Sequence, residues 1–228
     1  MVQRSERAGR PSEVVAIDGP AGSGKSTISR LVAQRVRLAM LDTGAMYRAV
    51  TCAVLRAGGD VADHDVATAA AEAATIVVDD VVTIDGVDVT SEIRGPEVSA
   101  NVSVVAAHPG VRRRLVGLQR EWMQRHGGGV VEGRDIGTVV FPDAPLKIYL
   151  TASPEVRARR RAGEGVLDVE AAARNIEERD RLDSSRDESP LKAADDAVVV
   201  DTSDLTVEQV VERIVLEADA RGVGGPGR

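Results

Sequence analysis

An eight-residue motif near the start of the chain constrains its fold more than any other feature of the sequence. Residues 19–26 read G-P-A-G-S-G-K-S, which fits the phosphate-binding pattern G-x-x-x-x-G-K-[ST] at every fixed position. An apolar run precedes the motif at residues 14–17, and apolar residues recur at helical spacing after it. A strand, a glycine-rich turn and a helix therefore follow one another in the order that a phosphate-binding loop requires.

Each part of this loop has a physical role. Glycines let several backbone N–H groups approach one phosphate, and the following helix adds the positive end of its dipole. Lys25 can reach the outer phosphates of a nucleoside triphosphate, and Ser26, or Thr27 beside it, can offer a hydroxyl to nucleotide-bound Mg²⁺. The predicted nucleotide-binding residues are Gly19, Pro20, Ala21, Gly22, Ser23, Gly24, Lys25, Ser26 and Thr27.

Alternating apolar runs and helical patterns predict an α/β fold along the rest of the chain. The expected strands after the first lie at residues 38–41, 130–131, 146–150 and 197–201. The expected helices lie at about 45–55, 63–74, 96–107, 109–126, 154–162, 168–183 and 206–220, with the glycines at 127–129 ending the fourth of them. Five parallel strands with the loop at the first crossover predict a P-loop sandwich, in which helices cover both faces of a parallel sheet.

One segment breaks this alternation. Short β-branched runs lie between residues 75 and 89, and Asp79-Asp80 and Asp85-Gly86 separate them. Such a pattern is typical of a small antiparallel meander. We therefore predict an inserted β subdomain at about residues 62–95.

Composition excludes several classes of partner. Only 2% of the residues are aromatic, so Val, Ala, Leu and Ile must form the core, which suits a buried parallel sheet. A formal net charge of -7 argues against general binding to nucleic acid or membranes. No apolar run approaches the ~20 residues of a spanning helix. Because Cys52 is the only cysteine, no intrachain disulfide can form. We expect a cytoplasmic monomer without a nucleic-acid or membrane partner.

The distribution of arginines favours one use of the bound nucleotide. A guanine-reading N-K-x-D motif, expected of a switch protein, does not occur, and a motor should be larger. A small-molecule kinase needs a second anion pocket and a mobile arginine-bearing cover. Arginines cluster where strands end and in two later groups, at 157–161 and 179–186. The sequence thus favours a small-molecule kinase.

Two aspartates near the predicted phosphates have two open interpretations. Asp18 and Asp42 each follow an expected strand. Each could orient water on Mg²⁺, or each could cap a turn by accepting from backbone N–H groups.

Four segments carry distinctive motifs: residues 19–27, 41–48 (L-D-T-G-A-M-Y-R), 133–143 (G-R-D-I-G-T-V-V-F-P-D) and 178–186 (E-R-D-R-L-D-S-S-R). Together these motifs resemble those of bacterial cytidylate kinases. The resemblance extends from about Val14 to Ala220 and implies transfer of the ATP γ-phosphoryl group to CMP or dCMP with Mg²⁺. A shikimate- or gluconate-type kinase is the nearest enzyme alternative, and an inactive nucleotide-binding module is the alternative from another class.

The resemblance also implies roles for individual residues. Lys25 and the lid arginines Arg157, Arg160 and Arg161 would neutralise the transferred charge. Residues 25–27 read Lys-Ser-Thr where the family has lysine-glycine-threonine, which leaves open whether Ser26 or Thr27 holds Mg²⁺; we assign Ser26. Thr43 stands where the family has a serine, which does not threaten the assignment. The implied substrate-binding residues are Thr43, Arg48, Ser103, Arg112, Arg134, Asp135, Arg179, Asp183 and Arg186.

The implied domain organisation has three parts. The core comprises residues 14–44, 127–153 and 186–220, and an NMP-binding domain with the β insertion comprises 45–126. Residues 154–185 would form the lid with its flanking helices. Residues 1–13 and 221–228 are expected to be flexible tails.

Overall fold

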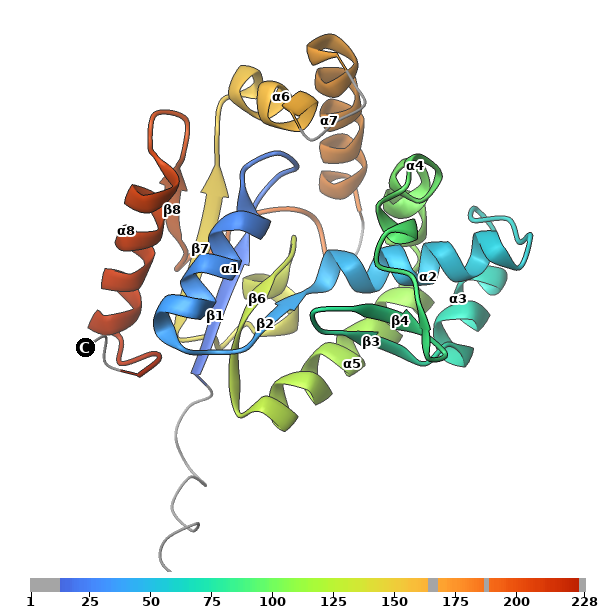
Figure 1. Ribbon diagram of the computed structural model, residues 1–228, viewed down its shortest axis with the longest axis horizontal. Coiled ribbons are helices and arrows are strands. Elements are labelled where there is room, and N and C mark those ends of the chain that lie inside the picture. The colour runs from blue at the N-terminus through green and yellow to red at the C-terminus, as the bar shows by residue number, and fades with distance from the viewer. Residues whose placement is uncertain (1–12, 164–167, 187–188, 226–228) are drawn as a thin grey trace, which may run out of the picture.

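The structure is a computed structural model that describes residues 13–163, 168–186 and 189–225. Five strands form one parallel sheet in the order β2-β6-β1-β7-β8 (Figure 1). They are β1 (Glu13–Asp18), β2 (Met40–Asp42), β6 (Gly128–Glu132), β7 (Leu146–Thr151) and β8 (Val198–Asp201). The prediction of a five-stranded parallel sheet is confirmed. Since β1 is the central strand, the loop that follows it lies at the middle of the sheet's carboxyl edge, where ligands of such sheets bind.

Helices cover both faces of this sheet because successive residues of β1 point in opposite directions. Val15 and Ile17 enter a core with α1 (Lys25–Val36) and α8 (Val207–Ala220), whereas Val14 and Ala16 enter another core with α5 (Pro109–His126). All four β1 residues are fully buried. This two-sided burial explains why the strand reads as an unbroken apolar run.

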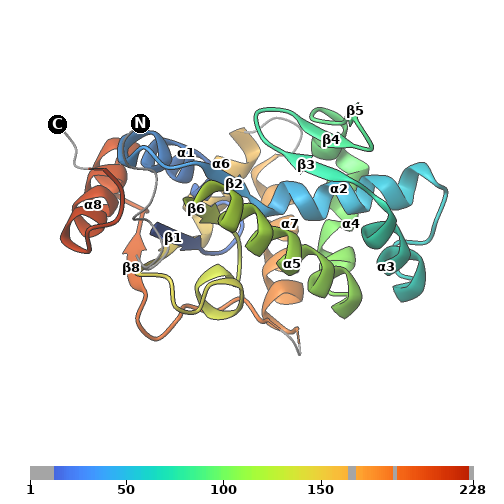
Figure 2. The ribbon, with the colours of Figure 1, turned by 90° about the horizontal axis from the view of Figure 1, so that it is seen from below.

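A second part of the molecule lies beside the sheet, on the right in Figure 1. It contains α2 (Thr43–Arg56), α3 (His64–Ala73), η1 (Glu92–Arg94) and α4 (Pro96–Val105). It also holds an antiparallel sheet of β3 (Ile76–Val78), β4 (Val82–Ile84) and β5 (Val87–Asp88). Seen from below in Figure 2, this small sheet lies on the opposite side of α2 from α5. The predicted β meander is therefore present, and it interrupts the α/β alternation.

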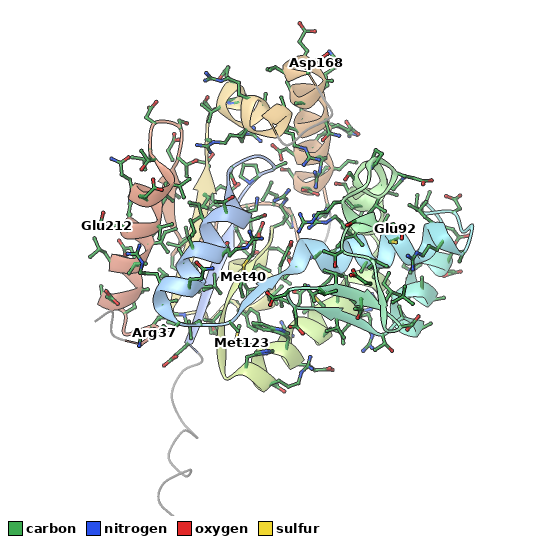
Figure 3. All side chains as sticks on the ribbon, in the orientation of Figure 1. Arg37, Met40, Glu92, Met123, Asp168 and Glu212 are labelled. Atoms are coloured by element: carbon green, nitrogen blue, oxygen red, sulfur yellow. The ribbon has the colours of Figure 1, made fainter. Side chains whose placement is uncertain are left out.

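Two further helices, α6 (Pro154–Gly163) and α7 (Val169–Ser184), lie beyond the carboxyl edge of the main sheet (Figure 1). The N-cap of α6 is Ser153 as expected, because its Oγ accepts a hydrogen bond of 3.3 Å from the backbone N of Val156. Asp168 caps α7 at the end far from the sheet, as Figure 3 shows. The predicted break at 163–165 lies mostly outside the described residues. The lower end of α7 lies near α4 (Figure 1).

Several local expectations need correction. Gly127 alone ends α5, with φ 70°, while Gly128 and Gly129 are the first residues of β6. Residues 136–140 form a π-helical turn, η2 (Ile136–Val140), that the sequence pattern did not predict. The expected tail from 221 onward packs against α1 as far as it is described, since Val223 is 3% exposed and the N of Gly225 donates to the O of Val36. The expected N-terminal tail lies almost wholly outside the described residues.

Among the described helices, none is both long and apolar enough to cross a membrane.

Candidate active site

The phosphate-binding loop lies between β1 and α1, with its opening glycine pressed against β7. Gly19 has φ 149°, and a Cβ atom placed there would lie 2.0 Å from the backbone oxygen of Leu150. Gly22 has φ 74°, and its Cβ would lie 2.9 Å from the backbone oxygen of Arg157. Only glycine fits at both positions. The loop is therefore packed closely against β7 on one side and α6 on the other.

Lys25 begins α1 and points back along the loop. The residue is only 6% exposed, and its Nζ donates a hydrogen bond of 2.8 Å to the backbone oxygen of Pro20. Burial, and secondly the charge of Arg134, lowers the pKa of Lys25 to about 7. A phosphate beside Nζ would reverse that shift. The carboxylates near Lys25, Glu132 and Asp18, do not offset the effect of burial on its pKa, so the loop favours an additional negative charge beside Nζ.

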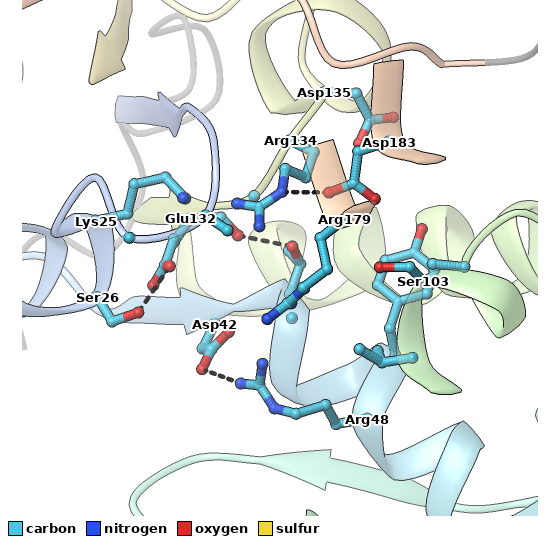
Figure 4. A pocket seen from close by; sticks show the side chains of 18 of the residues that line it. Lys25, Ser26, Asp42, Arg48, Ser103, Glu132, Arg134, Asp135, Arg179 and Asp183 are labelled. Atoms are coloured by element: carbon cyan, nitrogen blue, oxygen red, sulfur yellow. Dashed lines mark hydrogen bonds and ion pairs between the residues drawn. The ribbon is translucent and has the colours of Figure 1, made fainter. Parts of the chain in front are cut away.

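A cavity of about 270 Å³ opens beside the loop, and residues from distant parts of the chain line it (Figure 4). Seven arginines and Lys25 share it with four carboxylates. Because the cations outnumber the carboxylates, the cavity suits a ligand with several negative charges. The arginines are Arg48, Arg94, Arg112, Arg134, Arg161, Arg179 and Arg186, and the carboxylates are Asp42, Glu132, Asp135 and Asp183.

The cavity brings together most of the residues that the sequence singled out. From the loop and the start of α1 it is lined by Ala21, Gly22, Gly24, Lys25, Ser26 and Thr27. All nine residues predicted to bind the second substrate line it too, namely Thr43, Arg48, Ser103, Arg112, Arg134, Asp135, Arg179, Asp183 and Arg186. Of the three predicted lid arginines, only Arg161 does so. The predicted residues outside the lining are Gly19, Pro20, Ser23, Arg157 and Arg160.

Arg134, just after β6, connects three parts of the site. Its Nε donates 2.8 Å to Asp183 on α7, and its Nη1 donates 2.8 Å to the backbone oxygen of Gly19. Burial by itself would raise the pKa of Asp183, but Arg134 and Arg186 outweigh that effect and hold the pKa below its usual range. The carboxylate therefore stays ionised and keeps both arginines in place.

Arg112 and Asp135 form a second fixed pair, and each residue is 4% exposed. Arg112 comes from α5, and its guanidinium carbon lies 5.7 Å from the centre of the Tyr47 ring. Its Nη1 also donates 3.3 Å to the backbone oxygen of Ala106. These contacts orient both charged groups along the wall formed by α2, α4 and α5.

Arg179 is different, because it reaches into the cavity without a partner among the described residues. In the described ranges 13–163, 168–186 and 189–225 its guanidinium forms no hydrogen bond or ion pair, and its Nε is buried. Burial, and secondly Arg134, lowers the pKa of Arg179 to about 10, so the group remains charged at neutral pH. Figure 4 shows it extending into the space between Arg134 and Arg48. A half-buried cation that has no partner among the described residues and extends into a cavity is typical of an anion-binding site.

Glu132, the last residue of β6, is a site residue that the sequence reasoning missed. The Oγ of Ser26 donates 2.8 Å to its Oε1, whereas its Oε2 is buried and has no hydrogen-bond partner within the described part of the chain. Burial, and secondly the nearby Asp42, raises the pKa of Glu132. A carboxylate at the exit of the strand beside β1 was the available signal. The Oγ1 of Thr43 donates 2.6 Å to the backbone oxygen of the same residue.

Asp18 and Asp42 both cap backbone turns. Asp42 accepts 2.9 Å from the N of Ala45 at the start of α2 and pairs at 3.0 Å with Arg48. Asp18 accepts 2.8 Å from the N of Ile136 and 2.8 Å from the N of Gly137. Asp42 lines the cavity, whereas Asp18 is absent from the lining. Of the two interpretations, capping is the one that the geometry supports for both residues.

Arg157 and Arg160 on α6 hold the outer side of the loop instead of facing the cavity. Arg157 donates 3.2 Å to the backbone oxygen of Ala21 and pairs with Asp180. Arg160 donates 2.8 Å to Thr202 Oγ1 and 2.7 Å to the Thr202 backbone oxygen. Asp180, which the sequence reasoning did not single out, also accepts 3.1 Å from the N of Ala21. Side chains of α6 and α7 thus bind the backbone of the loop without lining the cavity.

Comparisons with known proteins agree with this set of site residues. A protein-family profile described as Cytidylate kinase matches residues 15–220. The chain belongs to the cytidylate kinase family. A cytidylate kinase of Mycobacterium avium (strain 104) is 56% identical over 211 residues, which is 88% of this chain and 92% of that protein. A cytidylate kinase of Corynebacterium glutamicum is 50% identical over 220 residues, or 91% of this chain and 95% of that protein.

Solved structures of lower similarity agree on the fold. The crystal structure of an uncharacterized protein from Eubacterium ventriosum has a TM-score of 0.54 at 11% identity, covering 91% of this chain and 98% of that chain. A protein from Thermus thermophilus has a TM-score of 0.52 at 18% identity, covering 93% of this chain and 98% of that chain. The family assignment therefore rests on the sequence relatives, and these structures support the α/β architecture.

Proposed function

We propose that this member of the cytidylate kinase family transfers the γ-phosphoryl group of ATP to CMP or dCMP, giving ADP and CDP or dCDP. The supporting observation is the shared cavity, in which Lys25 of the phosphate-binding loop and the arginines after β6 and on α7 face one space. One nucleotide on the loop and another among the arginines would meet end to end there. The relatives named above support cytidine as the base of the acceptor.

In this proposal the loop at residues 19–27 holds the phosphates of ATP. Arg48, Arg134 and Arg179 lie where they can bind the phosphate of the acceptor, and guanidinium groups match its oxygens bidentately. Asp135 and Asp183 can accept from sugar hydroxyls. The list of base- and phosphate-contacting groups is completed by Thr43, Ser103, Arg112 and Arg186.

A magnesium ion fits the residues beside the loop. Ser26 offers a hydroxyl, and Glu132 offers a carboxylate oxygen that is buried and lacks a partner among the described residues. Oxygen donors of this kind suit Mg²⁺, which takes its remaining ligands from phosphates and water. The described residues contain no group of three or more His, Cys, Asp or Glu side chains that could hold a metal ion. When bound, the ion would neutralise charge on the phosphates.

The reaction needs no strong base, because the acceptor phosphate oxygen is already anionic at neutral pH. The work of the protein is to align the two nucleotides and to neutralise the negative charge that spreads in the transition state. Lys25 and Arg161 already line the cavity. In our proposal Arg157 and Arg160 join them only after exchanging their present backbone contacts for phosphate contacts when the lid moves.

A panel of acceptors with ATP and Mg²⁺ in a coupled ADP assay tests the proposal. CMP and dCMP should be phosphorylated faster than other nucleoside monophosphates, and shikimate and gluconate should not react. ADP release with shikimate or gluconate alone would replace the proposal by the nearest enzyme alternative. No release with any acceptor would indicate a nucleotide-binding module without activity.

The variant Lys25→Ala adds a test of mechanism. It should fold and bind CMP but lose turnover by on the order of 10³-fold, by analogy with cationic groups that stabilise phosphoryl transfer. Turnover equal to that of the parent protein would contradict the role of Lys25. We further propose a cytoplasmic monomer that uses no nucleic-acid or membrane partner, and light scattering tests its oligomeric state.

A further inference from the structure

Asp18 is a buried carboxylate that the mechanism above does not use. It is the last residue of β1, directly before the phosphate-binding loop, and it is 5% exposed. Both of its oxygens accept from backbone amides: Oδ1 accepts 2.8 Å from the N of Ile136, and Oδ2 accepts 2.8 Å from the N of Gly137. The residue does not line the cavity, so its carboxylate faces the segment after β6 and not the space for the nucleotides.

The two amides that Asp18 holds belong to the first turn of η2. The N-cap of this π-helical turn is Asp135, whose own side chain makes no capping hydrogen bond. Instead, Asp135 turns toward Arg112 and pairs with it. A residue 118 positions away along the chain therefore supplies the cap that the turn lacks locally, which frees Asp135 for the cavity.

Other hydrogen bonds join the same two segments. The N of Gly133 donates 3.0 Å to the backbone oxygen of Ile17, and Nη1 of Arg134 donates 2.8 Å to the backbone oxygen of Gly19. Three consecutive residues, from the end of β1 to the first residue of the loop, thus receive hydrogen bonds from the segment after β6. Of these three acceptor residues, Ile17 and Gly19 use their backbone oxygens, and only Asp18 uses its side chain.

We propose, on the basis of the function proposed above, that Asp18 is a positioning residue for the acceptor nucleotide. By holding the amides of Ile136 and Gly137, its carboxylate fixes the backbone directly after Arg134 and Asp135. It thereby sets the distance between the acceptor-binding pair and the phosphate-binding loop. Asp18 touches neither nucleotide.

The variant Asp18→Asn tests this proposal with little change in volume. It keeps one acceptor and turns an NH₂ group toward a backbone N–H, so one buried amide loses its partner. Calorimetric titration gives the Kd of CMP and the Kd of a non-hydrolysable ATP analogue with Mg²⁺. One unsatisfied buried amide can change an equilibrium constant by more than a factor of ten. We therefore expect the CMP Kd to rise at least about fivefold more than the Kd of the ATP analogue. A smaller difference overturns the proposal.

Arg120→Gln is the matched control, since it disturbs the same turn from its other end. Arg120 donates 3.1 Å to the backbone oxygen of Val140 and 2.9 Å to that of Val139. It should change the two Kd values by similar factors. If Arg120→Gln weakens CMP binding as selectively as Asp18→Asn does, then any damage to η2 has this effect. That result would overturn a specific role of Asp18.

A second measurement applies if Asp18→Asn does not fold. Hydrogen exchange in the parent protein without nucleotide should show slow exchange at the amides of Ile136 and Gly137, because Asp18 holds them before CMP arrives. Fast exchange at both amides overturns the proposal. Failure of the parent protein to bind CMP at all would instead refute the proposed function, so the two failures are distinguishable.

Discussion

Nucleotide binding should be accompanied by proton uptake at Lys25. Burial and the charge of Arg134 lower the pKa of this lysine to about 7 in the nucleotide-free protein. At pH 8 only about one tenth of the molecules would then carry the proton on Nζ, whereas phosphates beside Nζ favour the charged form in nearly all of them. Binding at pH 8 should therefore take up a large fraction of one proton per molecule, and binding at pH 6 much less.

The sign of the pH dependence follows from the same shift. The bound state holds more protons than the free state above pH 7, so affinity should fall as pH rises, by close to tenfold between pH 8 and pH 9. Arg179 does not contribute, because its pKa of about 10 leaves it protonated at pH 8 in both states. Mg²⁺ is omitted so that the metal adds no charge beside Glu132, whose pKa is raised by burial and secondly by Asp42.

Isothermal titration with ADP, in buffers of different ionisation enthalpy, measures the number of protons directly. Lys25→Arg keeps the positive charge but stays protonated, so its uptake should be close to zero. Lys192→Arg changes an exposed lysine outside the cavity and should retain the uptake of the parent protein. No uptake by the parent at pH 8, or equal uptake by Lys25→Arg, would refute the reasoning.

Three further predictions concern single residues. Glu132→Gln keeps the size of the side chain but removes the carboxylate beside Ser26. The reaction rate at limiting Mg²⁺ should therefore fall about 10- to 100-fold. An unchanged dependence of the rate on Mg²⁺ would contradict the proposed metal site. Arg179→Met removes a half-buried cation that has no partner among the described residues, so it should raise the melting temperature while weakening CMP binding. Arg181→Met, which removes an exposed pair with Glu178, should do neither. A lower melting temperature for Arg179→Met would count against this interpretation of Arg179. Gly19→Ala would place Cβ 2.0 Å from the oxygen of Leu150 and should strongly lower the urea concentration at the midpoint of unfolding. Gly58→Ala, at a position with φ 68° and no atom within 4 Å, should lower that midpoint far less. Equal midpoints for the two variants would show that β7 moves to accommodate the added methyl group.

Local pattern was enough to predict the central sheet and the loop. The unbroken apolar runs, such as residues 14–17, reflect burial on both faces of a parallel sheet, and that signal lies within a few residues. The segment at residues 75–89 could be predicted because its turns contain Asp and Gly at hairpin spacing.

The missed features depend on partners far away in the sequence. The first turn of η2 is capped by Asp18, 118 residues from Ile136, and nothing within residues 134–140 indicates that partner. Glu132 becomes a site residue only when β6 lies beside β1 and brings it to Ser26. Likewise, the contacts of Arg157 and Arg160 with the loop and with Thr202 depend on how α6 packs, which spacing along the chain cannot fix.

Our central claim is that one cavity holds both nucleotides end to end. The most direct measurement is titration with a single compound in which adenosine and cytidine are joined through five phosphates. We expect one molecule to bind per chain, to compete with both ATP and CMP, and to bind far more tightly than either nucleotide alone. Competition with only one of the two substrates, or affinity no better than that of ATP, would contradict the claim.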